Sequence, residues 1–160
     1  MVLEKSRARA KRRQKAQRSS ENIPKFRYCK RTLKKAEHYL ESSIYLKRGN
    51  FSDISASTLF YSVYHCFLAI AIKFGYESRN QECTVALISY LAQEGKINLS
   101  QEVIKKFASL NQEELSESTA MKIREQLQYG TELSLKEEVY EGLLRLAKET
   151  ISKTKQILEQ

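Results

Sequence analysis

The 160-residue chain has few of the residues that interrupt helices, with only one proline and five glycines. Proline and glycine punctuate strands and turns far more often than they occur in helical bundles. No alternation of apolar and polar residues with hairpin turns is present, so nothing in the sequence indicates a β-sheet. Lys, Glu, Leu, Ala, Gln and Arg dominate instead, and all of them favour helices. The sequence therefore predicts an all-α, antiparallel helical bundle of five to six helices.

Histidine and cysteine, which often bind metals, are also scarce. The two histidines and three cysteines form neither a C-x-x-C pair nor an H-E-x-x-H motif. We therefore expect no metal site and no disulfide framework, and we interpret Cys29 and Cys66 as small core residues. The glycines stand singly and no G-x-S-x-G segment occurs, which argues against a phosphate loop and a hydrolase nucleophile. No cofactor is expected.

A long membrane-spanning run is missing as well. The most apolar stretch, residues 59–74, contains His65 and is interrupted by Ser62. We interpret this stretch as too short and too polar to cross a bilayer. The N-terminus lacks the apolar segment of a secretory signal. These observations predict a cytoplasmic protein that does not associate with a membrane.

Negative charge is nearly absent from the first part of the chain. Residues 1–35 hold 14 Lys/Arg against two Glu, a net charge of +12, whereas residues 36–160 hold 14 Lys/Arg against 17 Asp/Glu, a net charge of −3. Such asymmetry indicates an anionic partner, which is RNA, DNA, an acidic protein or a membrane surface.

The basic residues define the predicted domain organisation. We place a basic arm over residues 1–21 and a helical domain over residues 22–160. The arm is centred on Lys11, Arg12 and Arg13 and has no apolar stripe. It is either a solvated tail or an arm that binds nucleic acid and becomes ordered on binding.

Apolar residues recur at helical spacing through the rest of the chain. The first predicted helix begins near Pro24, ends at Gly49 and has apolar residues three or four positions apart. The second covers residues 54–74 after a cap at Ser52 or Asp53. Because it is apolar on nearly all sides, we expect it to be the central helix.

The second half of the sequence predicts shorter helices. Two are expected over residues 84–93 and 118–129, with a short helix between them that Asn98 or Ser100 caps. The last helix is expected to follow a capping box, in which a hydroxyl and a carboxylate each bond a free backbone N–H. The members of this box are Ser134 and Glu137.

Two polar residues stand out as candidate functional groups. His65 lies inside the most apolar helix, where we interpret it as a buried or half-buried histidine with one hydrogen-bond partner. The alternative is a polar group that lines a cleft between the second and fifth helices. Arg124 lies near the end of the fifth predicted helix. It is either a surface arginine that the helix dipole favours or a guanidinium that grips a phosphate through its forked donors.

The segments around these two residues resemble the HEPN family of helical domains. Residues 57–70, with the sequence STLFYSVYHCFLAI, are similar to the family's aromatic-rich second helix and its Tyr-Tyr-x-x-Phe-His-Ala pattern. Residues 124–130, with the sequence REQLQYG, are similar to the Arg-x4-Tyr-Gly ending of one HEPN branch. The order and separation of the segments also fit, and the resemblance covers about residues 24–158.

The resemblance implies a four- or five-helix bundle, often dimeric, that associates with RNA or nucleotides. Many HEPN domains are RNases of toxin–antitoxin, CRISPR-linked or antiviral systems, and others pair with a minimal nucleotidyltransferase. Active members carry Arg-x4–6-His and cleave RNA without metal. Here the matching positions hold Tyr129, Gly130 and Thr131, and a tyrosine, with a pKa of ~10, is a poor base at neutral pH. The resemblance therefore implies a homodimer that lacks the full catalytic equipment.

Three functional hypotheses follow. In the leading one, Arg124 holds a phosphate, Tyr129 packs beside it or donates a hydrogen bond, and the basic arm adds salt-sensitive affinity. His65, Tyr61 and Tyr64 would line the same groove. In the second hypothesis, the protein is a divergent metal-independent RNase that uses Arg124 and Tyr129 at a dimer interface. In the third, it is a non-enzymatic adaptor whose basic tail binds nucleic acid or an acidic partner.

Overall fold

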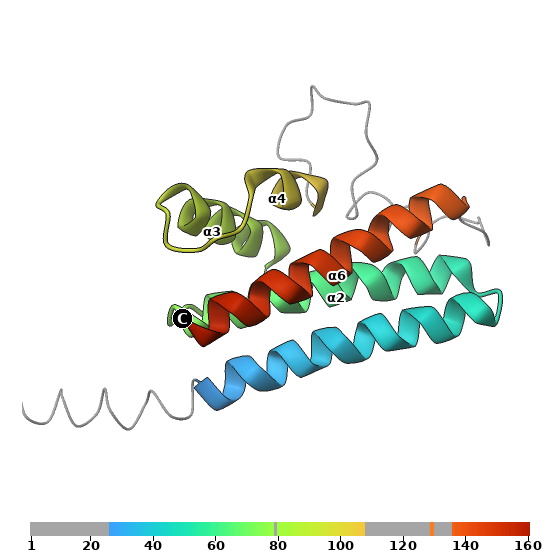
Figure 1. Ribbon diagram of the computed structural model, residues 1–160, viewed down its shortest axis with the longest axis horizontal. Coiled ribbons are helices and arrows are strands. Elements are labelled where there is room, and N and C mark those ends of the chain that lie inside the picture. Colours follow the sequence, from blue (N-terminus) through green and yellow to red (C-terminus); the bar gives the residue numbers. More distant parts are fainter. Residues whose placement is uncertain (1–25, 79, 108–128, 130–135) are drawn as a thin grey trace, which may run out of the picture.

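A computed structural model describes residues 26–78, 80–107, 129 and 136–160. Over this part of the chain the predicted all-α bundle is confirmed, with five helices packed together and no strand (Figure 1). The basic arm, residues 124–128 and 130–131, and nearly all of the helix predicted over 118–129 lie outside the described residues. The helices are residues 26–48, α2 (Ser52–Lys73), α3 (Gln81–Gln93), α4 (Gln101–Phe107) and α6 (Glu137–Glu159).

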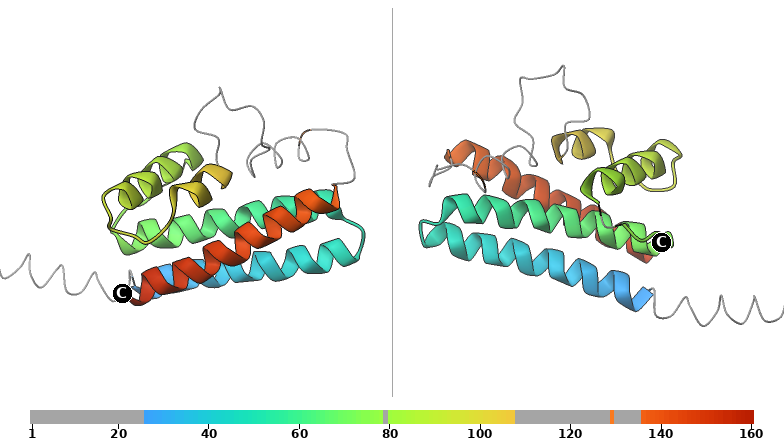
Figure 2. Two further views of the ribbon diagram at one scale, coloured as in Figure 1. Left: turned by 45° about the horizontal axis from the view of Figure 1, so that its top comes forward. Right: turned by 180° about the vertical axis from the view of Figure 1, so that it is seen from behind.

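Three long helices lie side by side and form the body of the domain (Figures 1 and 2). The helix over residues 26–48 runs antiparallel to α2 because a short turn joins them. α6 runs in the same direction as α2, and the Lys73 ammonium near the end of α2 donates a hydrogen bond to the Ile157 carbonyl near the end of α6. α3 and α4 lie together on one side of this body, close to α2 and α6.

α2 is the central helix, as its apolar composition predicts. Most of its residues are buried against the helices around it. With 22 residues it is longer than the apolar run seen in the sequence, and among the described helices it alone has the length and composition of a membrane span. The expectation that this segment does not cross a membrane concerned the shorter run over residues 59–74, and it stays a prediction. The core helix of a bundle meets the same criterion, because it too is apolar on nearly all sides.

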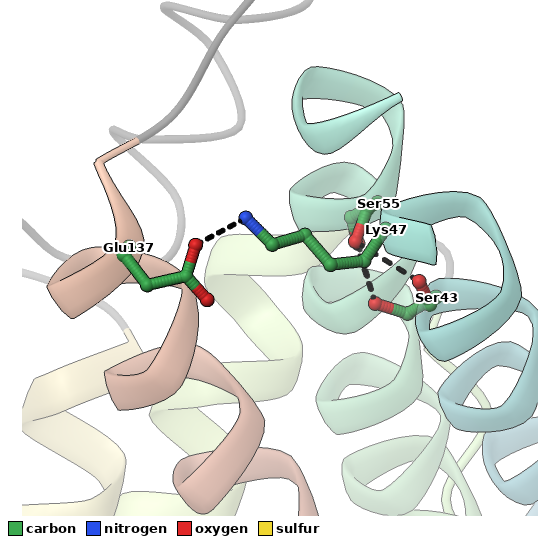
Figure 3. A network of polar contacts seen from close by, with 4 residues as sticks. All are labelled: Ser43, Lys47, Ser55 and Glu137. Atoms are coloured by element: carbon green, nitrogen blue, oxygen red, sulfur yellow. Dashed lines mark hydrogen bonds and ion pairs between the residues drawn. The ribbon is translucent and has the colours of Figure 1, made fainter. Parts of the chain in front are cut away.

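Small hydroxyl-bearing side chains let the long helices approach one another closely. Ser43 of the first helix and Ser55 of α2 are fully buried and face each other where these two helices pack together (Figure 3). The Ser43 hydroxyl lies 2.9 Å from the Ser55 carbonyl, and the Ser55 hydroxyl lies 3.1 Å from the Ser43 carbonyl. About two helical turns further along α2, Ser62 donates to the Ala36 carbonyl at 2.8 Å. These bonds satisfy hydroxyls that burial would otherwise penalise.

The starts of α3 and α4 are set by side-chain caps. The Asn80 side chain accepts hydrogen bonds from the backbone N–H groups of Glu82 and Cys83, at 2.8 and 3.3 Å. α3 consequently begins at Gln81, three residues before the predicted start. Ser100 accepts from the Val103 N–H at 3.3 Å, which confirms one of the two caps expected for α4.

The starts of α2 and α6 differ from the sequence prediction. Phe51 is the N-cap residue of α2 and makes no side-chain bond, so Ser52 and Asp53 lie in the first turn and do not cap the helix. α6 begins at Glu137 after an N-cap at Lys136, again without a side-chain bond. Glu137 is thus the first residue of the helix and not its third, so the predicted capping box was wrong; its other member, Ser134, lies outside the described residues. The Glu137 carboxylate instead forms an ion pair with Lys47 at 2.6 Å, across the bundle (Figure 3).

The core has a main cluster around α2 and a smaller one beside it. In the main cluster, Phe107 of α4 stacks on Phe60 and meets Phe67 edge-on, with ring centroids 4.8 and 5.0 Å apart. The smaller cluster contains Cys29 and Cys66, and both were correctly expected to be core residues. Burial raises the pKa of Cys66 to about 12, so its thiol stays protonated at neutral pH.

Candidate functional site

Aromatic side chains from two neighbouring helices gather around His65. Tyr64 and His65 lie three and four positions after Tyr61 on α2 and share a face with it, whereas Tyr39 comes from the helix over residues 26–48. The Tyr39 ring stacks on His65 with centroids 5.3 Å apart and lies 5.7 Å from Tyr61. Tyr64 meets His65 edge-on at 6.3 Å. All four side chains are half-buried, and we call them the aromatic–histidine patch.

One nitrogen of His65 has no partner in the patch. His65 Nδ1 is buried and makes no hydrogen bond within the described residues. The predicted half-burial of His65 is thus confirmed, but the predicted hydrogen bond is not found at this nitrogen. A buried polar atom without a partner costs about 1–3 kcal/mol. A side-chain rearrangement that exposed Nδ1 would let a polar group of a ligand recover this free energy.

The surroundings of His65 favour its neutral form. Burial, and to a lesser degree the positive charge of Lys35, lower its pKa below the ordinary value of 6.5. The Lys35 ammonium lies 5.9 Å from the centre of the Tyr39 ring. A neutral imidazole carries one donor and one acceptor nitrogen, so His65 can both donate and accept a hydrogen bond.

This pKa shift predicts a pH dependence of stability. The folded state binds the His65 proton less readily than the unfolded chain. The stability that neutral His65 contributes is therefore fully present above pH 6.5 and is lost as the pH falls through the lowered pKa of the folded state. We expect urea unfolding to show a free energy that declines below pH 6.5. His65→Gln should reduce this decline, whereas His38→Gln, at an exposed position, should keep it. An identical decline in His65→Gln and the unaltered protein would contradict the assignment.

Tyr64 connects the patch to the start of α3. Its hydroxyl lies 3.5 Å from the Thr84 hydroxyl, which is fully buried. The Thr84 oxygen in turn lies 2.7 Å from the Ser78 hydroxyl and 2.8 Å from the Asn80 carbonyl. Because Asn80 also caps α3, the loop before that helix and the Tyr64 ring are held by one set of polar contacts.

The structure brings together only part of the predicted site. His65, Tyr61 and Tyr64 lie near one another, whereas the groove that they were expected to line with Arg124 stays a prediction. Arg124 and the arm residues Lys11, Arg12 and Arg13 lie outside the described residues, so their predicted roles stay predictions. Tyr129 is described, and its side chain is 77% exposed. That exposure leaves its hydroxyl accessible to a partner molecule.

Tyr39 and Lys35 are members of this surface that the sequence analysis did not identify. A usable signal was present, because Lys35 and Tyr39 are four residues apart and therefore neighbours on one helical face. In the parts of the chain that the structure describes, no group of three or more His, Cys, Asp or Glu side chains is placed to hold a metal ion.

The fold and the patch together define a class of protein, a helical-bundle domain with an aromatic–histidine surface on its central helix. The sequence matches the model of the HEPN domain over residues 29–158. This match covers most of the chain and includes the whole patch, and the chain therefore belongs to the HEPN domain family, whose members associate with nucleotides or RNA. A comparison with curated proteins gives no match.

Proposed function

We propose that this HEPN domain binds RNA or a nucleotide, with a base on the aromatic–histidine patch. The observation that carries the proposal is the buried, unpartnered Nδ1 of His65 beside half-buried tyrosine rings. A nucleobase has flat faces that stack on such rings and edge groups that both donate and accept hydrogen bonds. Stacking of a base on an aromatic side chain contributes about 1–3 kcal/mol. A polar edge group that reached His65 Nδ1 would add a hydrogen bond to that stacking.

In the same proposal Arg124 holds a phosphate of the bound RNA or nucleotide. Its forked guanidinium suits a phosphate, and its spacing to Tyr129 supports the comparison with the Arg-x4-Tyr branch of the family. Tyr129, which is exposed, would donate a hydrogen bond next to it. The basic residues Lys11, Arg12 and Arg13 would add affinity that falls with salt.

We also propose that the protein acts as a dimer within a two-component system. Membership of the HEPN family supports a cytoplasmic toxin–antitoxin or defence pair whose second component is a nucleotidyltransferase-type protein. Light scattering on the purified protein measures the oligomeric state. Co-expression with the product of the neighbouring reading frame, followed by purification through a tag on one chain, tests the pairing.

Arg124→Ala provides the direct test of the proposed phosphate contact. Charge-assisted hydrogen bonds contribute about 1.5–3 kcal/mol, so the affinity for a short single-stranded RNA should fall roughly tenfold or more. Fluorescence anisotropy measures this affinity, and circular dichroism shows whether the variant is folded. Arg145→Ala, at an exposed position of α6, is the matched control and should bind as the unaltered protein does. Equal binding by both variants would remove Arg124 from the site.

A further inference from the structure

The outer side of the helix over residues 26–48 carries a row of cations. Arg27, Arg31, Lys34 and Lys35 are all exposed, and their spacings of four, three and one place them on neighbouring positions of one helical face. At a rise of about 1.5 Å per residue, the row is about 12 Å long. We call these four residues the basic row. They belong to the folded bundle and are separate from the arm over residues 1–21.

No carboxylate neutralises the basic row within the described structure. Residues 26–36 contain neither Asp nor Glu, and the next acidic residue, Glu37, is paired with Lys155 of α6 at 2.6 Å. Like charges four residues apart, such as Arg27 with Arg31, each destabilise a helix by about 0.2–0.5 kcal/mol. The helix therefore retains repulsion that an anionic partner would relieve.

The basic row ends at the aromatic–histidine patch. Lys35 Nζ lies 5.9 Å from the centre of the Tyr39 ring, and that ring stacks on His65 with a centroid distance of 5.3 Å. A phosphate bound at Lys35 would consequently have its base next to the tyrosine stack. Another exposed ring, Tyr28, lies between the cations of the row in sequence and is 61% exposed. Cations along a path with aromatic rings beside it are the combination that binds single-stranded nucleic acid.

We infer that the helix over residues 26–48 is a track for single-stranded RNA, in which the basic row binds successive phosphates and the patch stacks a base at the end of the track. The inference rests on the proposed function and adds the class of ligand and its path. A duplex fits less well, because its bases are stacked on one another and do not offer their faces to a tyrosine. A protein partner with acidic side chains would use the cations but would leave the patch without an occupant.

The test removes three charges from the basic row in the full-length protein. R27Q/R31Q/K34Q leaves Lys35 and the patch in place and should not unfold the helix, because it relieves repulsion at exposed positions. For single strands the slope of log K against log salt is about −0.7 per phosphate contact, so this variant should flatten the slope by about 2. Its affinity for a short single-stranded RNA at low salt should fall at least about tenfold. K105Q/R145Q/K148Q removes three exposed charges from α4 and α6 and should change both quantities much less.

Further measurements separate this inference from the proposed function. AMP has one base and one phosphate, so its binding reports on the patch without the track. If AMP binding depends on Tyr39 but R27Q/R31Q/K34Q binds RNA like its control, the track is wrong and the proposed function stands. If R27Q/R31Q/K34Q loses RNA binding while Tyr39→Leu, checked for folding by circular dichroism, does not, the stacking end of the track is wrong. Equal or tighter binding of duplex RNA or single-stranded DNA would overturn the assignment to single-stranded RNA.

Discussion

Phe107→Ala is expected to lower the free energy of unfolding by about 3–5 kcal/mol, the range typical of a large aromatic removed from a core. Phe107 is fully buried at the end of α4, stacked on Phe60 and in edge contact with Phe67. The seven-residue α4 is too short to be stable alone, so it depends on such packing. Loss of the ring would leave a cavity between α4 and the central helix. Chemical denaturation monitored by circular dichroism measures the change in the free energy of unfolding.

Phe51→Ala is the matched control for this prediction. The Phe51 side chain is 53% exposed in the turn between the first helix and α2, so its removal should cost less than about 1 kcal/mol. The contrast between the two phenylalanines tests the described core directly. A Phe107→Ala variant as stable as Phe51→Ala would mean that α4 does not pack on α2 as described.

Ser62→Leu is expected to lower the free energy of unfolding by about 2–3 kcal/mol. Ser62 has no exposed surface and its hydroxyl donates to the Ala36 carbonyl of the first helix at 2.8 Å. A leucine there would remove the hydrogen bond and add carbon atoms where two helices are in close contact, and overpacking of this kind typically costs about 1–3 kcal/mol. Thermal and urea unfolding both report the effect.

Ser62→Ala separates the two contributions. It removes the hydroxyl without adding volume, and its cost should be about 1 kcal/mol, the usual net contribution of one hydrogen bond. If Ser62→Leu and Ser62→Ala were equally stable, the space around Ser62 would be larger than the structure shows. If the leucine variant were the more stable, the close approach of the two helices would be wrong.

Much of the fold could be predicted from the sequence because it depends on local patterns. Scarce proline and glycine and the repeat of apolar residues every three or four positions were enough for an all-α bundle with α2 at its centre. Helix starts were harder, because they depend on which tertiary partner a side chain finds. Glu137 could have closed a capping box by local sequence, yet in the fold it pairs with Lys47, a residue far away in the chain.

The candidate site could be predicted only where its residues are neighbours in sequence. Tyr61, Tyr64 and His65 share one turn of a helix, so their common face follows from helical spacing. Tyr39 joins them only because the first helix packs on α2, and a single sequence gives no register for that packing. The basic row was visible as charge, but its place beside the patch depends on the same packing. The relation of Arg124 to these residues remains a prediction.

If this HEPN domain binds RNA at the aromatic–histidine patch, as proposed, the rings of the patch should respond to added RNA. The most direct test is a titration of isotope-labelled protein with a short single-stranded RNA, followed through the ring signals of its tyrosines and histidines by NMR. The largest changes are expected at Tyr39, Tyr61, Tyr64 and His65, with much smaller changes at Tyr90, which is exposed on α3. Saturating RNA binding that leaves the four patch rings unchanged would contradict the proposal.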